Sequence, residues 1–172
     1  MLGPRRTEAP VLVFTDGACE PDCTSIGGVL LDGETVEYFG ARIPLPLCKK
    51  WCTKDGQTQV IGQAELFPVL VARLTWKSKL KGRRVLFFLD NESARLGLVK
   101  AYSPVLPSLE IIMQCLEWDY AFNVDASYAR VPTASNISDG PSRMSARYIS
   151  GRYGGRSIRP VFPGDIQPEE TL

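Results

Sequence analysis

Apolar runs separated by turn signals mark the strands expected in the first half of the chain. Residues 11–15 and 85–89 are continuous apolar runs of the kind that forms strands buried on both faces. Asp32-Gly33 is a strong two-residue hairpin signal between the segments 28–31 and 34–43. The pattern predicts a three-stranded antiparallel meander and, after an intervening helix, a fourth strand.

Apolar residues that recur every three or four positions predict the helices. One repeat predicts a helix over residues 63–76, and a short helix is expected over residues 92–100. A second repeat predicts a helix that follows two prolines, and its residues are Leu106, Leu109, Met113, Leu116 and Tyr120. A strand over residues 124–131 follows, and a last helix begins at Asn136 or Ser138 and fades before Gly151.

The predicted order of elements is β-β-β-α-β-α-α-β-α, which indicates an α/β fold with a five-stranded mixed sheet flanked by helices. Residues 11–150 are expected to form one domain. Residues 1–10 are expected to be a flexible leader, and residues 44–61 a loop. Residues 151–172 are first basic and then contain proline and glycine, so they are expected to be an extended or mobile tail.

Composition narrows the possible chemistry. The chain has 172 residues and a formal net charge of +1, which excludes a globally cationic nucleic-acid binder. It contains no histidine, so it cannot by itself build a Ser-His-Asp hydrolase, a His-ligated zinc enzyme or a Cys-His protease. Its chemistry must depend on carboxylates, thiols, lysines or hydroxyls.

The sequence favours an intracellular location, cytoplasmic or nuclear, with no membrane partner. No apolar stretch approaches the roughly 20 residues that a bilayer span needs, and no apolar run follows the charges of the first residues as in a secretory signal. Five cysteines, an odd number, argue against a pure disulfide framework and suggest reduced thiols.

Four carboxylates are expected to converge at one end of the sheet. Asp16 and Asp90 each follow an apolar run, and they would lie side by side if the first and fourth strands are parallel neighbours. Glu65 and Asp139 lie in the opening turns of predicted helices. Taken singly, each acid suits a turn or a helix start. Together they would repel one another unless cations bind, and oxygen ligands favour Mg²⁺ or Mn²⁺.

Four segments resemble ribonuclease H. The segments Thr15-Asp16-Gly17-Ala18-Cys19 and Ile26-Gly27-Gly28-Val29-Leu30 resemble its first hairpin. Gln63-Ala64-Glu65-Leu66 resembles its acidic helix start, and Phe88-Leu89-Asp90-Asn91-Glu92-Ser93 resembles its fourth strand and acid. Residues 131–143 are similar to the closing block of this domain in retroelement reverse transcriptases. The pattern Asn-x-x-Asp-x-x-Ser-Arg, starting at Asn136, looks most like that of the DIRS-type elements.

The resemblance implies a ribonuclease H-like fold and endonucleolytic cleavage of the RNA strand of RNA–DNA hybrids. It implies that two Mg²⁺ or Mn²⁺ ions bind to Asp16, Glu65, Asp90 and Asp139. It also implies a partner, either the rest of a reverse transcriptase or a larger assembly. Many members of the family carry an auxiliary histidine, which this chain lacks. Two alternatives stay open: a DNA-directed nuclease of the same superfold, and a weak or inactive module that binds nucleic acid or a protein.

Polar groups beside these acids are the candidates for substrate contact. They are the side chains of Gln63, Asn91 and Asn136, and the backbone at Gly17 and Ala18. Asn136 is equally suited to be a helix N-cap.

Basic residues fall in two groups. The group within residues 77–84 is interpreted as a solvated face. A second group begins at Arg143 and has no acid among residues 142–160. Tyr148 and Tyr153 are interleaved with its arginines, so this group is a candidate for contact with nucleic acid.

Cysteines form two Cys-x-x-x-Cys pairs, Cys19 with Cys23 and Cys48 with Cys52. The loops after the first and third strands lie at the same end of the sheet, so the four thiolates are candidates for one structural zinc site. The alternative is a set of isolated thiols.

Overall fold

The computed structural model describes residues 8–53 and 60–172. In chain order, the elements of the first half are β1 (Val11–Glu20), β2 (Cys23–Asp32), β3 (Thr35–Arg42), α1 (Leu45–Thr53), α2 (Ile61–Thr75), α3 (Lys77–Leu80) and β4 (Arg84–Leu89). Those of the second half are α4 (Glu92–Lys100), α5 (Leu106–Phe122), β5 (Asp125–Arg130), a 3-10 turn (Thr133–Ser135), α6 (Asp139–Ser142), α7 (Arg147–Tyr153), β6 (Arg156–Ser157) and β7 (Glu170–Thr171).

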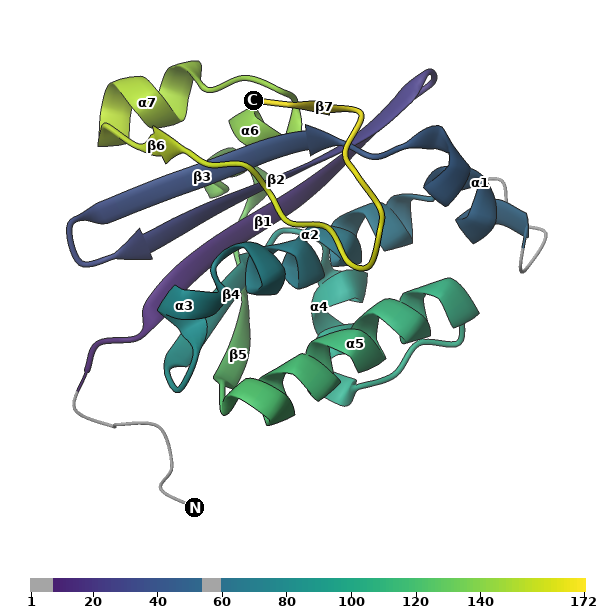
Figure 1. Ribbon diagram of the computed structural model, residues 1–172, viewed down its shortest axis with the longest axis horizontal. Helices are drawn as coiled ribbons and strands as arrows, with labels where there is room; N and C mark the ends of the chain where they lie inside the picture. The colour runs from purple at the N-terminus through teal and green to yellow at the C-terminus, as the bar shows by residue number, and fades with distance from the viewer. Residues whose placement is uncertain (1–7, 54–59) are drawn as a thin grey trace.

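The strands of the described residues form one mixed sheet in the order β5-β4-β1-β2-β3-β6, and β7 pairs with the remaining part of the β3 edge (Figure 1). The meander β1-β2-β3 is antiparallel, whereas β4 is parallel to both β1 and β5. The predicted α/β class, the meander and the parallel placement of the first and fourth strands are confirmed. β6 and β7 extend the predicted five-stranded sheet.

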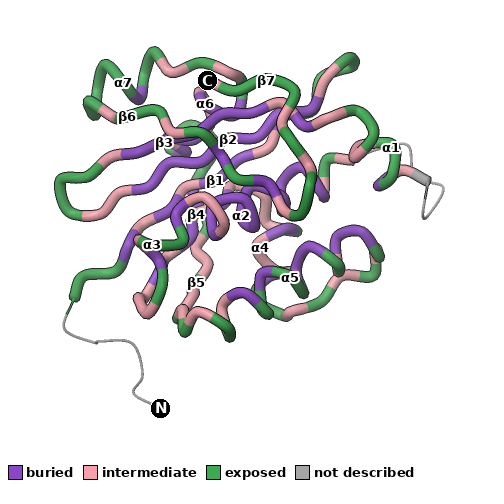
Figure 2. The backbone as a smooth tube through the Cα atoms, viewed as in Figure 1, coloured by how far each residue is buried: buried purple, intermediate pink, exposed green. Residues whose placement is uncertain are grey.

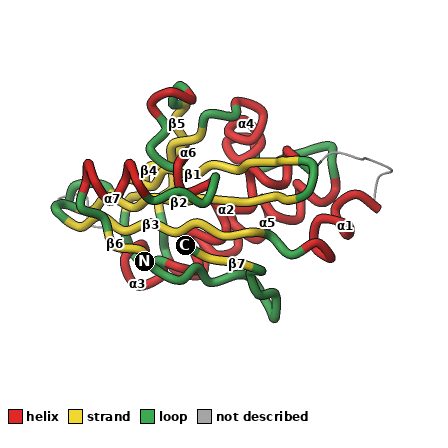
Figure 3. The backbone as a smooth tube through the Cα atoms, turned by 90° about the horizontal axis from the view of Figure 1, so that it is seen from above, coloured by secondary structure: helices red, strands yellow, loops and turns green. Residues whose placement is uncertain are grey.

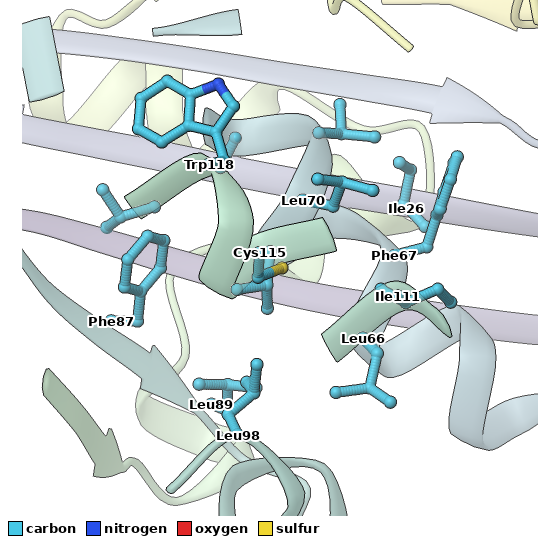
Figure 4. Packing of buried hydrophobic residues seen from close by; sticks show 14 of the residues in the cluster. Ile26, Leu66, Phe67, Leu70, Phe87, Leu89, Leu98, Ile111, Cys115 and Trp118 are labelled. Carbon is cyan, nitrogen blue, oxygen red and sulfur yellow. The ribbon is translucent and has the colours of Figure 1, made fainter. Parts of the chain in front are cut away.

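Helices cover the sheet on both faces. α2 and α5 pack on one face, where Phe67, Leu70 and Ile111 belong to the same buried cluster as Phe87 and Leu89 of β4 (Figure 4). α7 lies on the other face, where Ile149 packs against Val29 of β2 and Tyr38 of β3 (Figure 3). Alternation along β1 sends Val11 and Val13 to the first core and Phe14 to the second.

α1 occupies part of the segment expected to be a loop. Pro46 lies in its first turn, where a missing N–H is tolerated. Trp51 is buried and its ring meets the Phe67 ring edge-on at 5.4 Å. This packing stabilises a helix that the local sequence does not reveal. The rest of the expected loop, residues 54–59, lies outside the described residues.

The expected last helix is divided in two. Met144 has a φ of 60°, in the left-handed region, and it separates α6 from α7. α7 begins at Arg147 and runs through Gly151 to Tyr153, so the prediction that the helix fades before Gly151 is wrong. No local sequence signal indicates that Met144 adopts the left-handed backbone conformation.

The C-terminal segment packs against the sheet instead of forming an extended or mobile tail. β6 and β7 both pair with β3. Phe162 is buried and its ring meets the Phe67 ring edge-on at 5.2 Å. At the other end, the expected leader falls mainly on residues 1–7, outside the described residues, while the Glu8 carboxylate lies 3.4 Å from Arg83.

α5 buries a different face from the one that its apolar repeat indicates. Of that repeat, every residue except Leu109 is exposed, Tyr120 by 85%. The helix buries Ile111, Ile112, Cys115 and Trp118 against α2 and the sheet. Both stripes have helical spacing, so the repeat locates the helix without identifying its inner side.

None of the helices in the described part of the chain has the length and apolarity needed to cross a membrane.

Candidate metal centre

Three carboxylates meet where β1, β4 and the start of α2 adjoin. Asp16 lies in β1, Asp90 directly follows β4, and Glu65 is in the second turn of α2. One carboxylate oxygen from each lies within 4.8 Å of those of the other two. The structure therefore brings together three of the four acids expected at this end of the sheet.

Asp16 is not at the end of its strand, as the sequence suggested, because β1 continues to Glu20 in its ladder with β2. The parallel ladder of β1 with β4 ends earlier, at the pair Phe14 and Phe88. Asp16 and Asp90 each come two residues after this pair. The two acids are thus neighbours just beyond the last parallel pair, where the strands part.

Burial and repulsion from neighbouring carboxylates disfavour the ionised forms of Asp16 and Glu65. Burial, followed by the charge of Asp90, raises the pKa of Asp16 to about 7. Burial, followed by the charges of Asp16 and Asp90, raises the pKa of Glu65 to about 9. A hydrogen bond from the Gly17 backbone partly opposes the increase at Glu65. A divalent cation among the three oxygens would remove this repulsion.

Two glycines let α6 approach Asp16 closely. Gly27 of β2 is the Cα partner both of Asp16 on β1 and of Gly40 on β3. A Cβ at Gly27 would overlap the backbone of Ser142, and one at Gly40 would overlap the Pro141 carbonyl. The bare backbone of these two residues thus forms a flat seat for α6 beside the carboxylates.

Ser142 links α6 to Asp16. Its hydroxyl is fully buried and lies 2.8 Å from Asp16 Oδ2 and 2.8 Å from the backbone carbonyl of Asp139. This hydrogen bond lowers the pKa of Asp16, against the effect of burial. Ser142 is a site residue that was not predicted from the sequence, and its place three residues after Asp139 in the closing block is the signal that could have identified it.

Asp139, the fourth predicted acid, is outside the group of three. Its side chain is 40% exposed, and its Oδ1 lies 3.3 Å from Nε of Arg143, one turn further along the chain. Its charge nevertheless contributes to raising the pKa of Asp16, so it lies within electrostatic range of the centre.

Gln63 and Asn91, predicted to contact substrate, line one cavity of about 440 Å³ that also borders Ser108. Gln63 is buried and donates from Nε2 to Ser108 Oγ at 2.9 Å. Asn91 caps α4 by accepting a hydrogen bond from the Ala94 backbone at 2.9 Å. The Gln63 side chain therefore links α2 to α5, and the Asn91 side chain stabilises the start of α4.

Asn136 has a structural role. It is 4% exposed, donates from Nδ2 to the Thr15 carbonyl, and accepts from the Ser138 hydroxyl. It fastens the segment before α6 to β1. The alternative prediction that Asn136 is a helix N-cap is wrong, because Ser138 is the N-cap of α6 and no side chain caps this helix.

The backbone groups predicted at Gly17 and Ala18 are also enclosed. A Cβ at Gly17 would overlap the Ala64 carbonyl of α2, and Ala18 is buried. The close approach at Gly17 places Glu65 beside Asp16.

The four paired cysteines border one cavity of about 880 Å³ between the β1–β2 hairpin and α1. Cross-strand partners share a face of the hairpin, so Cys19 lies with Thr24 and Cys23 with Glu20. Accordingly, the Thr24 hydroxyl lies 3.9 Å from Cys19 Sγ, and Cys23 Sγ lies 4.0 Å from Glu20 Oε2. Among the described side chains, no three thiols lie within 4.8 Å of one another.

No protein-family model matches this sequence, and no curated protein matches it either. Solved structures do match. RNase H1 from the halophilic archaeon Halobacterium salinarum NRC-1 aligns with a TM-score of 0.55 at 20% identity, over 81% of this chain and 98% of that one. LC11-RNase H1 in complex with an RNA/DNA hybrid aligns with a TM-score of 0.51 at 14% identity, over 81% and 98% of the two chains.

A third match is the N-terminal RNase H domain of a Mycobacterium tuberculosis protein, solved as a fusion with maltose-binding protein. Its TM-score is 0.51 at 16% identity, over 80% of this chain and 98% of that one. The structural alignments establish a shared fold. Sequence identities this low do not establish a shared activity, so activity has to be argued from the site. The chain therefore has the ribonuclease H fold, with an acidic triad where β1, the end of β4 and α2 adjoin.

Proposed function

We propose that this protein is a divalent-metal-dependent endonuclease that hydrolyses the RNA strand of RNA–DNA hybrids. The observation that carries the proposal is the meeting of Asp16, Glu65 and Asp90 within 4.8 Å of one another. The ribonuclease H fold and the hybrid bound in the LC11-RNase H1 structure support this choice of substrate.

The chemistry of the donor set fits Mg²⁺ or Mn²⁺. All three groups are carboxylates, which these cations prefer. Burial and the neighbouring carboxylates raise the pKa of Asp16 and of Glu65, and a bound cation would offset the repulsion. We propose that Asp139 completes the site as a fourth ligand and that two ions bind. Such ions supply an activated water and neutralise charge on the scissile phosphate.

The residues of the site have two tasks in this proposal. Asp16, Glu65 and Asp90 hold the cations, and Ser142 orients the Asp16 carboxylate through its hydrogen bond. The chain has no histidine to move a proton near neutral pH, so we expect slow turnover. The similarity of the closing block to retroelement reverse transcriptases supports an origin in such a polyprotein, and we propose a partner domain or assembly on that basis.

The test uses labelled RNA–DNA hybrid, duplex DNA and a four-way junction, each with Mg²⁺ or Mn²⁺. We expect cleavage of the RNA strand of the hybrid and a loss of at least about a hundredfold in Asp90→Asn. Asp165→Asn is the matched control, because Asp165 is exposed and outside the site. Cleavage of the junction alone would identify a DNA-directed nuclease. Folded protein that binds the hybrid but cleaves nothing would identify an inactive module.

A further inference from the structure

The surface of α7 combines exposed arginine and tyrosine side chains. We define the α7 surface by Arg147, Tyr148, Arg152 and Tyr153. Ile149 is fully buried and anchors the helix, while these four side chains are exposed (Figure 2). The helix therefore presents two cations and two aromatic rings to solvent.

The other basic group of the sequence is largely satisfied within the protein. Arg83 pairs with Asp32 at 2.8 Å, Arg84 donates to the Glu8 carbonyl, and the Lys77 ammonium lies 4.3 Å from the centre of the Phe122 ring. In contrast, neither Arg147 nor Arg152 has an ion pair or a hydrogen bond to any side chain in the described ranges. No acid occurs among residues 142–160 to neutralise them.

Aromatic rings accompany these charges. Tyr148 is 55% exposed and Tyr153 is 39% exposed, and their ring centroids are 6.1 Å apart in an edge-on arrangement. Arginines that neutralise phosphates and aromatic rings that stack on bases are together the features of a surface for single-stranded nucleic acid. Only unpaired bases expose the faces on which such rings stack.

The α7 surface lies on the same side of the sheet as the Asp16 carboxylate. Ser142 of α6 contacts Asp16 on that side, and only residues 143–146 separate α6 from α7. The neighbouring part of this face, where the Phe14 and Phe88 rings stack at 4.5 Å, is only half-buried. A strand that leaves the carboxylates across this face can therefore reach α7.

We infer that the α7 surface binds a single-stranded extension of the nucleic-acid substrate, and that the preferred substrate is a hybrid carrying such an extension. This inference rests on the proposed function for the position of the hybrid, but its test measures binding alone. The two ideas can therefore fail separately.

The experiment measures binding by fluorescence anisotropy in EDTA, with a blunt hybrid and with the same hybrid carrying a single-stranded extension. We expect the wild type to bind the extended hybrid about tenfold more tightly. Arg147→Ala/Arg152→Ala should lose that preference and lower the salt dependence, the slope of log K on log salt, by about 1.4. Lys79→Ala/Lys81→Ala removes the same charge elsewhere and should keep the preference. Tyr148→Ala should weaken binding, and Tyr148→Phe should retain it.

Equal binding of the blunt and extended hybrids by the wild type overturns the inference. So does an equal effect of the arginine and lysine double variants, provided that circular dichroism shows both are folded. If the arginine variant binds oligonucleotides normally and loses a protein partner instead, the surface serves that partner and the inference fails. Cleavage of blunt hybrid retained in the arginine variant leaves the nuclease proposal intact. If the wild type cleaves nothing and still binds the extended hybrid more tightly, the result supports binding at the α7 surface and contradicts the nuclease proposal.

Discussion

The hydroxyl of Ser142 donates a 2.8 Å hydrogen bond to Oδ2 of Asp16, which lies 126 residues earlier in the chain. This bond joins the closing block to the first strand, and the glycine seat formed by Gly27 and Gly40 makes it possible. It is also one of the few interactions that favour the charged form of Asp16, the form needed to bind a cation.

Removing this hydroxyl should weaken metal binding. In Ser142→Ala the Asp16 carboxylate loses a charge-assisted hydrogen bond, so its pKa should rise further and its affinity for Mn²⁺ should fall roughly tenfold. Isothermal calorimetry at constant pH measures the affinity. Ser150→Ala is the control, because that hydroxyl donates to the carbonyl of Ala146, the residue before α7. Equal Mn²⁺ affinity in Ser142→Ala and wild type would show that Ser142 does not orient the site.

The metal-free protein should lose stability as the pH rises. Asp16 and Glu65 have pKa values of about 7 and about 9 in the folded state, against 3.8 and 4.5 without burial. Between about pH 4 and pH 9 the unfolded chain releases protons that the folded chain keeps, so the free energy of unfolding decreases with pH. Thermal unfolding in EDTA across this range measures the decrease, and Mg²⁺ should reduce it.

Glu65→Gln isolates the source of this pH dependence. The amide carries no charge, so the metal-free variant should melt higher than wild type at pH 8, by about 3 °C or more, and depend less on pH. Glu37→Gln is the contrasting change at another buried acid. Glu37 accepts from Trp76 and Arg156, so this variant should melt lower at every pH. A metal-free Glu65→Gln that is less stable than wild type at pH 8 would contradict the repulsion described above.

Adding one methyl group at Gly27 should displace α6. The new Cβ would overlap the Ser142 backbone, so Gly27→Ala should cost about 1–3 kcal/mol in the free energy of unfolding and lower metal affinity. Gly151→Ala is the control, because nothing lies within 4 Å of a Cβ there and the residue is in a helix. Denaturant unfolding and calorimetry compare the two, and equal stability of both variants would argue against a close seat for α6.

A buried ion pair in the main core should be essential for stability. Arg73 is fully buried and forms a two-pronged pair with Asp119, with its Nη2 also donating to the Tyr128 hydroxyl. Asp119→Ala would leave the guanidinium unpaired and should cost about 3–5 kcal/mol. Arg95→Ala breaks the surface pair with Glu92 and should cost far less than that. Comparable losses in the two variants, measured by denaturant unfolding, would refute the central role of Arg73.

The cysteine cavity should hold no zinc in this arrangement. No three of the described thiols lie within 4.8 Å of one another, whereas four thiolates bound to one zinc ion would lie closer together than that. We expect elemental analysis of the purified protein to find well under one equivalent of zinc, and chelation to leave the melting temperature unchanged. One equivalent that is lost in Cys48→Ser would instead establish the four-cysteine site.

Local sequence determined the elements that build the sheet. The runs 11–15 and 85–89 and the Asp32-Gly33 turn located β1, β4 and the meander, because buried strands and two-residue hairpins have strong short-range signatures. The order of the elements then left one arrangement in which Asp16 and Asp90 are neighbours. Three acids of the candidate site followed from that order.

Tertiary packing decided what has no short-range signature. α1 depends on the contact of Trp51 with Phe67, and β6 and β7 are two residues long and exist only as partners of β3. Both apolar stripes of α5 have helical spacing, so contact with α2 selected the buried one. The hydrogen bond from Ser142 to Asp16 depends on which face each side chain takes in a folded sheet. These features depend on contacts between residues far apart in the chain, so no short segment of the sequence could predict them.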